Sequence, residues 1–252
     1  MRQLDDMNLA FHLASAIGRM LRGSRSGGML TGRALAGVAT ESAQVLVDEV
    51  LHVHRPGDGV LSENGRDDPS RLNKSRVWIV DVIDGTKEFS TGRADWTVHV
   101  CLTIDGVPGP SAVGLPESDR VFRSDHVEYV DGPLSNIMVM SRNNPPDFAP
   151  TVAERLGFSI RPMGSAGAKM LSVLLGDADA YLHAGGQYEW DQAAPVGVAL
   201  ASGLHASRID GSPIEFNKPE TFSPDILVCR PELADDFIRT VGDVVGDGLP
   251  VS

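Results

Sequence analysis

The sequence predicts a layered fold that is α+β in its first half and α/β in its second half. Helix-like apolar spacing opens the chain, and a series of short strand-like runs follows it. Later in the chain, strand-like and helix-like segments alternate, which is typical of helices packed on a sheet. We therefore expect an N-terminal α+β domain at residues 1–133 and a C-terminal α/β domain at residues 134–252.

The elements of the first half follow from its periodicity. Apolar residues recur at helical spacing in residues 9–21 and 43–53, so two amphipathic helices are expected there. Residues 23–37 between them are rich in Gly, Ser and Arg without a steady period, which predicts a mobile loop. Short β-branched or apolar runs predict strands at residues 60–63, 77–80, 96–104, 111–115, 121–123 and 137–140.

The second half changes rhythm at Asn144-Pro145-Pro146, a turn that introduces a helix. A strand between the first two helices and another at residues 178–182 complete an alternating pattern. Pro195 is expected in or near the first turn of the last helix, where its missing N–H is tolerated. The helices are expected at residues 148–156, near 168–175 and from about 193 to 201.

The composition excludes several classes of partner. The 22 basic and 34 acidic residues give a formal net charge of −12, which disfavours binding to nucleic acid. Cys101 and Cys229 lack metal-ligand spacing and are expected to be buried free thiols. Neither a secretory signal at the start of the chain nor an apolar stretch long enough to span a bilayer is present in the sequence. We expect a cytoplasmic protein without membrane or nucleic-acid partners.

A pair of carboxylates at the end of an apolar run is the most informative feature. Asp81 and Asp84 would face opposite sides of a straight strand because their positions differ by three, an odd number. Gly85 allows a sharp turn that would bring both toward one point, with the carbonyl of Ile83 as a third oxygen. Thr86 would then begin a helix, where free N–H groups can hold a phosphate. These ligands indicate Mg²⁺-dependent phosphate chemistry, although a simple capped turn is the alternative.

Two further carboxylates strengthen the metal interpretation. Glu63 ends the short strand that precedes the pair, and Asp191 lies at the start of the last predicted helix. A helix N-terminus favours the ionised form of a carboxylate, which suits a metal ligand. A plain helix cap is the alternative for Asp191.

Three motifs then follow one another in the chain: Ser62-Glu63-Asn64, Asp81-Val82-Ile83-Asp84-Gly85-Thr86 and Trp190-Asp191-Gln192-Ala193. They resemble the Gly/Ser-Glu-Glu, Asp-Pro-(Ile/Leu)-Asp-Gly-Thr and Trp-Asp-x-Ala motifs of the inositol monophosphatase superfamily, which are lithium-sensitive, Mg²⁺-dependent phosphatases. Residues 87–89, 164–169 and 205–217 are most similar to CysQ-type 3′(2′),5′-bisphosphate nucleotidases. The resemblance covers about residues 59–217 and implies an α-β-α-β-α layered sandwich of the inositol monophosphatase and fructose-1,6-bisphosphatase type.

The resemblance also implies roles for the acidic residues. Glu63, Asp81 and the Ile83 carbonyl would hold one Mg²⁺, and Asp81, Asp84 and Asp191 a second, within a set of two or three ions. Glu63, Thr86 and Asp84 would be the catalytic residues, with the Thr86 hydroxyl orienting the attacking water.

The implied substrate is a small phosphate ester, 3′-phosphoadenosine 5′-phosphate or its phosphosulfate. The residues implied to contact it are Gly85, Thr86, Ser165, Gly167, Lys169, His183 and Asp191. Lys169 follows a loop of small residues that would permit close approach of a ligand, although a plain helix-start loop explains the pattern as well. A homodimer is the implied assembly.

Three positions depart from the family pattern and leave alternatives open. Thr40, with Glu41 beside it, stands where family members carry a water-activating Asp, and Asn64 replaces the second Glu of the first motif. Val82 replaces a proline without removing a ligand. One alternative is therefore a catalytically impaired nucleotide-binding or phosphate-binding relative. Another is an inositol monophosphatase or a fructose bisphosphatase, because the metal site does not choose the substrate.

Overall fold

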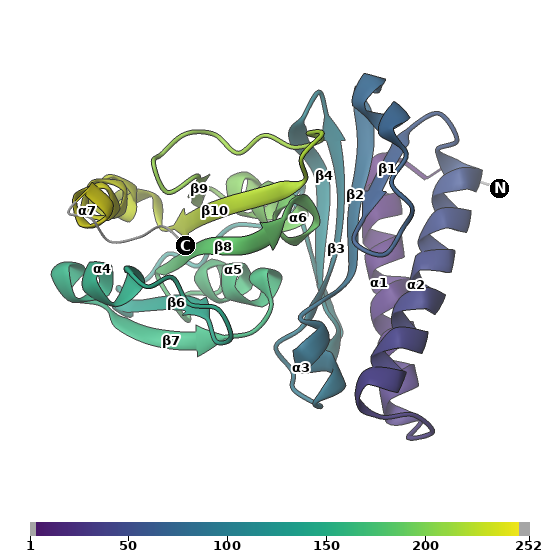
Figure 1. Ribbon diagram of the computed structural model, residues 1–252, viewed down its shortest axis with the longest axis horizontal. Coiled ribbons are helices and arrows are strands. Elements are labelled where there is room, and N and C mark those ends of the chain that lie inside the picture. Colours follow the sequence, from purple (N-terminus) through teal and green to yellow (C-terminus); the bar gives the residue numbers. More distant parts are fainter. Residues whose placement is uncertain (1–3, 247–252) are drawn as a thin grey trace.

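Two long helices form the outer layer on one side of the molecule (Figure 1). The computed structural model describes residues 4–246, in which α1 spans Asp6–Ser26 and α2 spans Gly32–His54. The sequence prediction of a loop over residues 23–37 is wrong, because only residues 27–31 separate the two helices. Leu35 and Ala36 are buried in the apolar core that the two helices share with the first sheet, and this packing outweighs the weak helix propensity of the glycines.

The first sheet has the strand order β1-β2-β3-β4-β5. β1 is parallel to β2, and the other neighbours are antiparallel. A short helix, α3 at Thr86–Ser90, follows β2 directly. The strands are β1 (Gly59–Ser62), β2 (Arg76–Asp84), β3 (Thr97–Ile104), β4 (Val107–Leu115) and β5 (Arg120–Arg123).

The second sheet has the order β7-β6-β8-β10-β9, with β6 parallel to both of its neighbours and β10 antiparallel to both of its own. Its strands are β6 (Ile137–Ser141), β7 (Ser159–Met163), β8 (Ala180–Tyr188), β9 (His205–Ser207) and β10 (Phe222–Cys229). Four helices cover its two faces (Figure 1). They are α4 (Ala149–Leu156), α5 (Ala166–Leu174), α6 (Glu189–Ala201) and α7 (Ala234–Gly246).

The five layers pack around three apolar cores. Because side chains alternate along a strand, neighbouring residues of one strand contribute to different cores. Trp78 and Val80 of β2 face α1 and α2, whereas Val77 and Ile79 face the middle layer of α5 and α6. The third core joins the second sheet to α4 and α7. The predicted α-β-α-β-α sandwich is therefore confirmed.

Helix α6 begins at Glu189, earlier than predicted, so Pro195 lies inside the helix and the expectation that it occupies the first turn is wrong. Proline has no N–H, so it donates no helical hydrogen bond to the carbonyl of Asp191, four residues earlier. Packing holds the helix at this point, because Ala194, Pro195 and Val196 are all buried.

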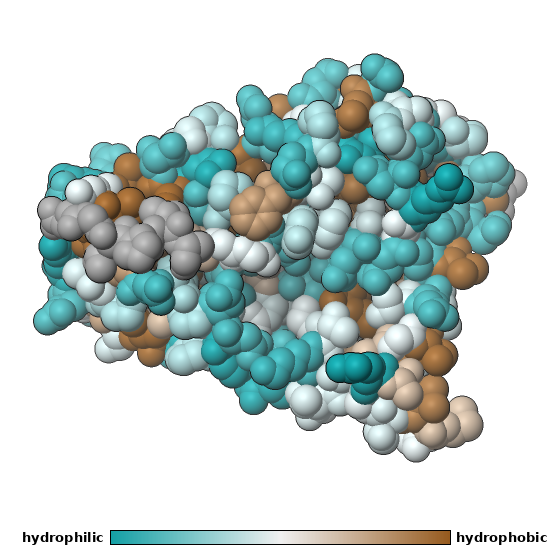
Figure 2. All heavy atoms as spheres, viewed as in Figure 1, coloured by the Kyte–Doolittle hydropathy of each residue, from teal (hydrophilic) through white to brown (hydrophobic). Residues whose placement is uncertain are grey.

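The two sheets fall on either side of residues 124–136, and the ends of the two predicted domains, residues 1–3 and 247–252, lie outside the described residues. Cys101 and Cys229 are both free and buried, as expected. No helix within residues 4–246 has the length and apolar character needed to cross a membrane. Hydrophilic side chains cover most of the face shown in Figure 2.

Candidate functional site

A β-bulge at the end of β2 brings Asp81 and Asp84 to the same side of the sheet. Asp81 pairs with His99 of β3 and Asp84 pairs with Thr97, so three steps along β2 match two steps along β3. The extra residue reverses the alternation, and Val82 and Ile83 both point into the core beneath α1 and α2. Both carboxylates consequently face the middle layer. The sequence analysis attributed their meeting to Gly85, whereas the bulge before it produces it.

Asp191 joins this pair from the second half of the chain. Single carboxylate oxygens of Asp81, Asp84 and Asp191 lie within 4.8 Å of one another. Asp191 stands in the first turn of α6, and its Oδ2 accepts a hydrogen bond from the Tyr188 N–H at 2.7 Å. The Oδ1 of Asp81 accepts the Ile83 N–H at 2.9 Å. We call these three residues the carboxylate triad.

Neutral donors hold Asp84 from the second half of the chain. Its Oδ2 accepts the Gly167 N–H at 2.9 Å and the hydroxyl of Ser165, the residue that caps α5. A side chain at position 167 cannot fit, since a Cβ there would lie 2.3 Å from His99 Nε2 and 2.4 Å from Thr97 Oγ1. Ser165 and Gly167, which the sequence analysis assigned to the substrate, are therefore engaged with Asp84.

Thr97 and His99 complete this support from β3. Both are fully buried, and Thr97 Oγ1 lies 2.8 Å from His99 Nε2 and 3.2 Å from Asp84 Oδ2. His99 Nδ1 lies 3.1 Å from the Trp190 carbonyl, which can only accept, so Nδ1 carries the proton. Burial lowers the pKa of His99, against the opposing charge of Asp84. A neutral His99 thus links β3 to the start of α6.

Glu63 lies beside the triad at its exposed rim. Its carboxyl group contacts that of Asp81, and its Oε2 accepts a hydrogen bond from the Asn64 side chain at 3.2 Å. Burial of part of the group and the charge of Asp84 raise the pKa of Glu63, whereas the Asn64 amide lowers it. Asn64 therefore supports the charged form of Glu63, which a second carboxylate at that position would oppose.

The electrostatics of the triad fit a divalent cation. Burial, followed by the charges of Glu63, Asp84 and Asp191, raises the pKa of Asp81 well above its usual range. Burial and the charge of Asp84 do the same to the pKa of Asp191. The Tyr188 N–H at the start of α6 acts in the opposite direction and lowers the pKa of Asp191. Mg²⁺ prefers oxygen ligands, and here several carboxylates of like charge lie close together, so the residues present fit the metal.

Lys169 is the nearest buried cation, but it does not form an ion pair with the triad. Its ammonium donates to the carbonyls of Gly164 and Ser165 and lies 5.0 Å from the centre of the Tyr181 ring. Burial lowers the pKa of Lys169 to about 8, although the acids of the site oppose this. Lys169 is only 3% exposed, so it lies beneath the loop instead of presenting its charge to a ligand.

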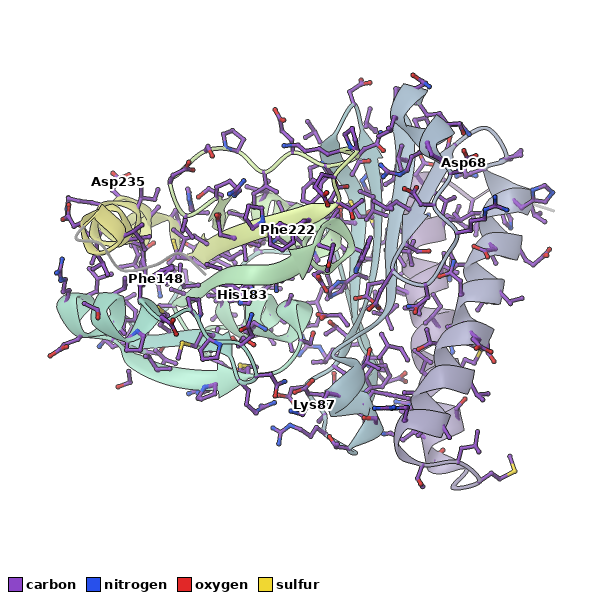
Figure 3. All side chains as sticks on the ribbon, in the orientation of Figure 1. Asp68, Lys87, Phe148, His183, Phe222 and Asp235 are labelled. Atoms are coloured by element: carbon purple, nitrogen blue, oxygen red, sulfur yellow. The ribbon has the colours of Figure 1, made fainter. Side chains whose placement is uncertain are left out.

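His183, labelled in Figure 3, lies on β8 opposite Ile226 of the neighbouring strand β10. It is buried, and within residues 4–246 neither ring nitrogen has a hydrogen-bond partner. Burial and the charge of Lys169 lower the pKa of His183 to about 4. The imidazole is therefore neutral near pH 7.

Gly85 and Thr86 connect β2 to α3. Gly85 has φ +89°, which favours glycine, and it caps the short helix. The Thr86 hydroxyl donates to the Ile83 carbonyl at 3.1 Å, so its oxygen remains free to accept a hydrogen bond. Thr40 lies half-buried on α2, and no hydrogen bond among the described residues joins it to Thr86.

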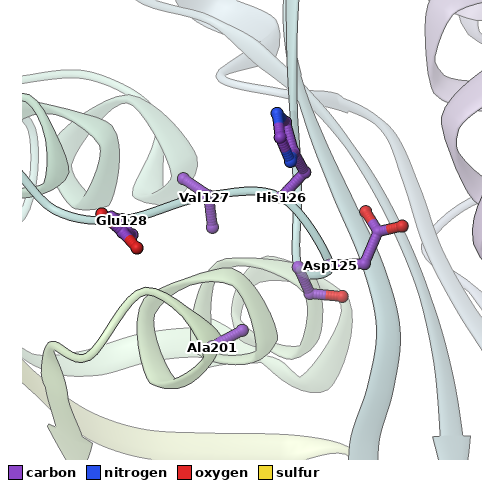
Figure 4. A pocket seen from close by; sticks show the side chains of 6 residues that line it. Asp125, His126, Val127, Glu128 and Ala201 are labelled. Carbon is purple, nitrogen blue, oxygen red and sulfur yellow. The ribbon is translucent and has the colours of Figure 1, made fainter.

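A cavity of about 470 Å³ lies elsewhere, between the β5–β6 connection and the end of α6 (Figure 4). Its wall includes Ala201, the last residue of α6, whereas Asp191 lies in the first turn of that helix. The cavity is therefore separate from the triad. Its lining residues are Ser124, Asp125, His126, Val127, Glu128 and Ala201.

The sequence analysis missed the support that Thr97 and His99 give to Asp84. A signal was present, since these two polar residues alternate with Val98 and Val100 on a mostly apolar strand. In a strand, residues two apart share a face, so a buried polar pair calls for a polar partner opposite. That partner is the Asp81–Asp84 segment, which lies directly across from them in the sheet.

A five-layered sandwich with a carboxylate triad between its two sheets places the chain in the class of layered α/β folds with an acidic metal-type site. The chain belongs to the inositol monophosphatase family, whose model matches residues 6–244. The resemblance inferred from its three motifs is thus confirmed.

Individual relatives extend over most of the chain. A 3′-phosphoadenosine 5′-phosphate phosphatase of Mycobacterium leprae is 43% identical over 258 residues, which cover 96% of this chain and 95% of that protein. A protein of the same name from Mycobacterium tuberculosis is 46% identical over 206 residues, covering 77% and 76%. Among solved structures, CysQ from Bacteroides thetaiotaomicron matches with a TM-score of 0.78 at 22% identity, covering 89% of this chain and 97% of that one. An inositol monophosphatase from Anabaena shares the fold with a TM-score of 0.76 at 21% identity, covering 97% and 96%.

Proposed function

We propose that the chain is a Mg²⁺-dependent phosphatase that hydrolyses the 3′-phosphate of 3′-phosphoadenosine 5′-phosphate, or of its phosphosulfate, to leave the 5′-nucleotide and inorganic phosphate. The observation that carries the proposal is the carboxylate triad, with Asp81 and Asp84 buried and Asp191 half-buried, which has no arginine or lysine partner among the described ion pairs. The relatives of that name, at 43% and 46% identity, support the choice of substrate.

The acidic residues divide into ligands and their support. Asp81, Asp84, Asp191, Glu63 and the Ile83 carbonyl would hold two or three Mg²⁺ ions. Bound Mg²⁺ lowers the pKa of a water molecule and stabilises negative charge on phosphoryl oxygens. One carboxylate oxygen of Asp84 accepts hydrogen bonds from Ser165 and Gly167, which leaves the other oxygen to bind a metal ion.

The remaining residues would act on water and phosphate. Glu63 at the exposed rim can accept a proton from water, and the free acceptor on Thr86 Oγ1 can orient that water. N–H groups of Gly85 and Thr86, at the start of α3, would hold phosphate oxygens. Asp191 and His183 remain the proposed contacts to the rest of the substrate, whereas Ser165, Gly167 and Lys169 would act by holding the site together.

The substrate assay tests the proposal directly. Purified protein is expected to release phosphate from 3′-phosphoadenosine 5′-phosphate with Mg²⁺ and to stop when a chelator is added. Asp84→Asn should abolish this turnover, whereas Asp235→Asn, an exposed change on α7, should not affect it. Equal activity with chelator, or an active Asp84→Asn variant, would contradict the mechanism.

The same assay separates the alternatives. Faster turnover of inositol 1-phosphate or of fructose 1,6-bisphosphate would move the assignment to those substrates. Thr40 favours the impaired relative, because it offers no carboxylate to Thr86. Nucleotide and Mg²⁺ binding without any phosphate release would establish that alternative. A homodimer in the cytoplasm is the proposed form of the enzyme.

A further inference from the structure

Three aromatic rings cluster at the junction of β8 and α6. Tyr188 and Trp190 are stacked, with ring centroids 4.9 Å apart and an interplanar angle of 10°. Phe222 meets Tyr188 edge to face, with centroids 5.9 Å apart. Tyr188 is 41% exposed and Phe222 is 42% exposed, while Trp190 is half-buried. We call these three residues the aromatic cluster.

The backbone ties the aromatic cluster to the carboxylate triad. The Tyr188 N–H donates to Asp191 Oδ2 at 2.7 Å, and Trp190 immediately precedes Asp191. Phe222 is the cross-strand partner of Tyr188, so β10 adds its ring to the same place. An organic group attached to a phosphate at the triad therefore has exposed aromatic surface within its reach.

Packing alone does not explain this arrangement. A cross-strand aromatic pair stabilises a sheet through the area that its side chains bury. Here Tyr188 and Phe222 are each still about two-fifths exposed, which leaves aromatic surface available to a ligand. The neighbouring Glu189 is buried and bound to the N–H groups of Asn217 and Lys218, so its charge is already satisfied. At the junction of β8 and α6, Tyr188 and Phe222 thus offer exposed aromatic surface that carries no charge of its own.

We propose that the aromatic cluster is the stacking surface for the nucleobase of the substrate. This inference rests on the proposed function and adds to it the part of the molecule that selects a nucleotide. A purine has flat π-faces that stack on aromatic side chains, whereas an inositol or a fructose ring has none. Stacking also places an uncharged group beside a strongly acidic site, where a further anion would be repelled.

Matched ligands and variants test the stacking surface. We would measure binding of AMP and of ribose 5-phosphate, which lacks only the base, in the presence of Mg²⁺. Trp78 and Trp96 are fully buried, so a ligand that quenches tryptophan fluorescence reports on Trp190. AMP should quench it and ribose 5-phosphate should not, and Trp190→Phe should abolish the signal.

The substitutions remove or retain one ring at a time. Tyr188→Ala and Phe222→Ala should each weaken AMP binding about 10- to 100-fold, measured by calorimetry, without a matching loss for ribose 5-phosphate. Tyr188→Phe keeps the ring and should retain most of the affinity. Leu200→Ala truncates an exposed residue at the other end of α6 and serves as the control.

Each outcome decides the inference. Three results would contradict the proposed stacking surface. The wild type does not bind AMP, both alanine variants bind AMP as tightly as the wild type does, or the substitutions weaken the binding of AMP and of ribose 5-phosphate equally. If AMP binding depends on the rings but no phosphate is released from 3′-phosphoadenosine 5′-phosphate, the nucleobase site stands and the proposed phosphatase fails. The two conclusions are thus tested separately.

Discussion

Two acidic regions of the molecule are neutralised in opposite ways. Between the first sheet and β6, Arg142 binds Glu88 at 2.8 Å and Asp95 at 2.6 Å. Hydrogen bonds from Arg142 and Arg93 lower the pKa of Asp95 to about 2, although burial opposes the shift. In the carboxylate triad, burial and neighbouring carboxylates raise the pKa of Asp81 and of Asp191.

The difference shows what the triad lacks. This chain supplies arginine partners to some acids that serve the fold, as Arg208 also does for the buried Asp225, and backbone N–H groups to others, as for Glu189. It supplies Asp84 with neutral donors, and it binds its nearest buried cation, Lys169, to carbonyl oxygens. The close approach of three carboxylates without an arginine or lysine partner among the described ion pairs thus supports the proposal that the triad accepts a metal cation.

The largest effect should come from Asp81→Asn. Loss of this shared ligand should reduce Mg²⁺-dependent turnover by about 10³-fold or more, since several kcal/mol of charge stabilisation are at stake. Without metal, the variant should be more stable than the wild type. The wild-type Asp81 has a raised pKa, so its folded state binds more protons and loses stability as pH rises above about 4.

Thermal unfolding with chelator checks this reversal. The melting temperature of the wild type should fall relative to that of Asp81→Asn as the pH is raised from 4 to 8. Added Mg²⁺ should restore the wild type by ligand linkage and have a smaller effect on the variant. A variant that is less stable than the wild type at every pH would show that the triad carries no repulsion.

Gly167→Ala should have an intermediate effect, because it disturbs the neutral hydrogen-bond donors that Asp84 has instead of an arginine partner. The new methyl group would displace His99 and Thr97 and weaken the hydrogen bonds that hold Asp84. We expect Mg²⁺ affinity or turnover to fall about 10- to 100-fold, as for other residues that orient a metal ligand. The control is Gly37→Ala in α2, where a Cβ meets no atom within 4 Å and activity should be unchanged.

Asp95→Asn should have the smallest effect and the opposite pH dependence. Because the pKa of Asp95 is lowered in the folded state, its contribution is present above about pH 4 and is lost as the pH falls toward 2. At pH 7 we expect a loss of about 1 kcal/mol, after allowing for solvent screening of this partly exposed pair. Urea unfolding at pH 7 and at pH 2.5 measures it, and equal losses at both pH values would contradict the ion-pair explanation.

Much of the fold could be predicted from the sequence, because its strands and helices carry clear periodicity. The α1–α2 connection could not, since the burial of Leu35 and Ala36 in a core formed with residues distant in the sequence decides where α2 begins. The same holds for the start of α6, where buried packing keeps Pro195 inside the helix. Local pattern thus failed where tertiary contacts reverse local preference.

The acids of the candidate site could be predicted from their motifs, but their supports could not. Asp81, Asp84 and Asp191 meet as expected. The roles of Ser165 and Gly167 depend on a hydrogen bond to a residue more than eighty positions earlier, which no local pattern encodes. Lys169 looked accessible because small residues precede it, and the loop closes over it instead.

The bulge in β2 makes the pairing of the segment between Asp81 and Asp84 matter more than its composition. Residues three apart in a regular strand face opposite sides, so losing the bulge at an unchanged chain length would turn Asp84 into the apolar layer beneath α1 and α2. Exchanging one apolar residue for another leaves the number of residues in the bulge intact. Val82 can therefore stand where the family motif has proline, whereas a regular pairing of this segment would remove a ligand without altering any acidic residue.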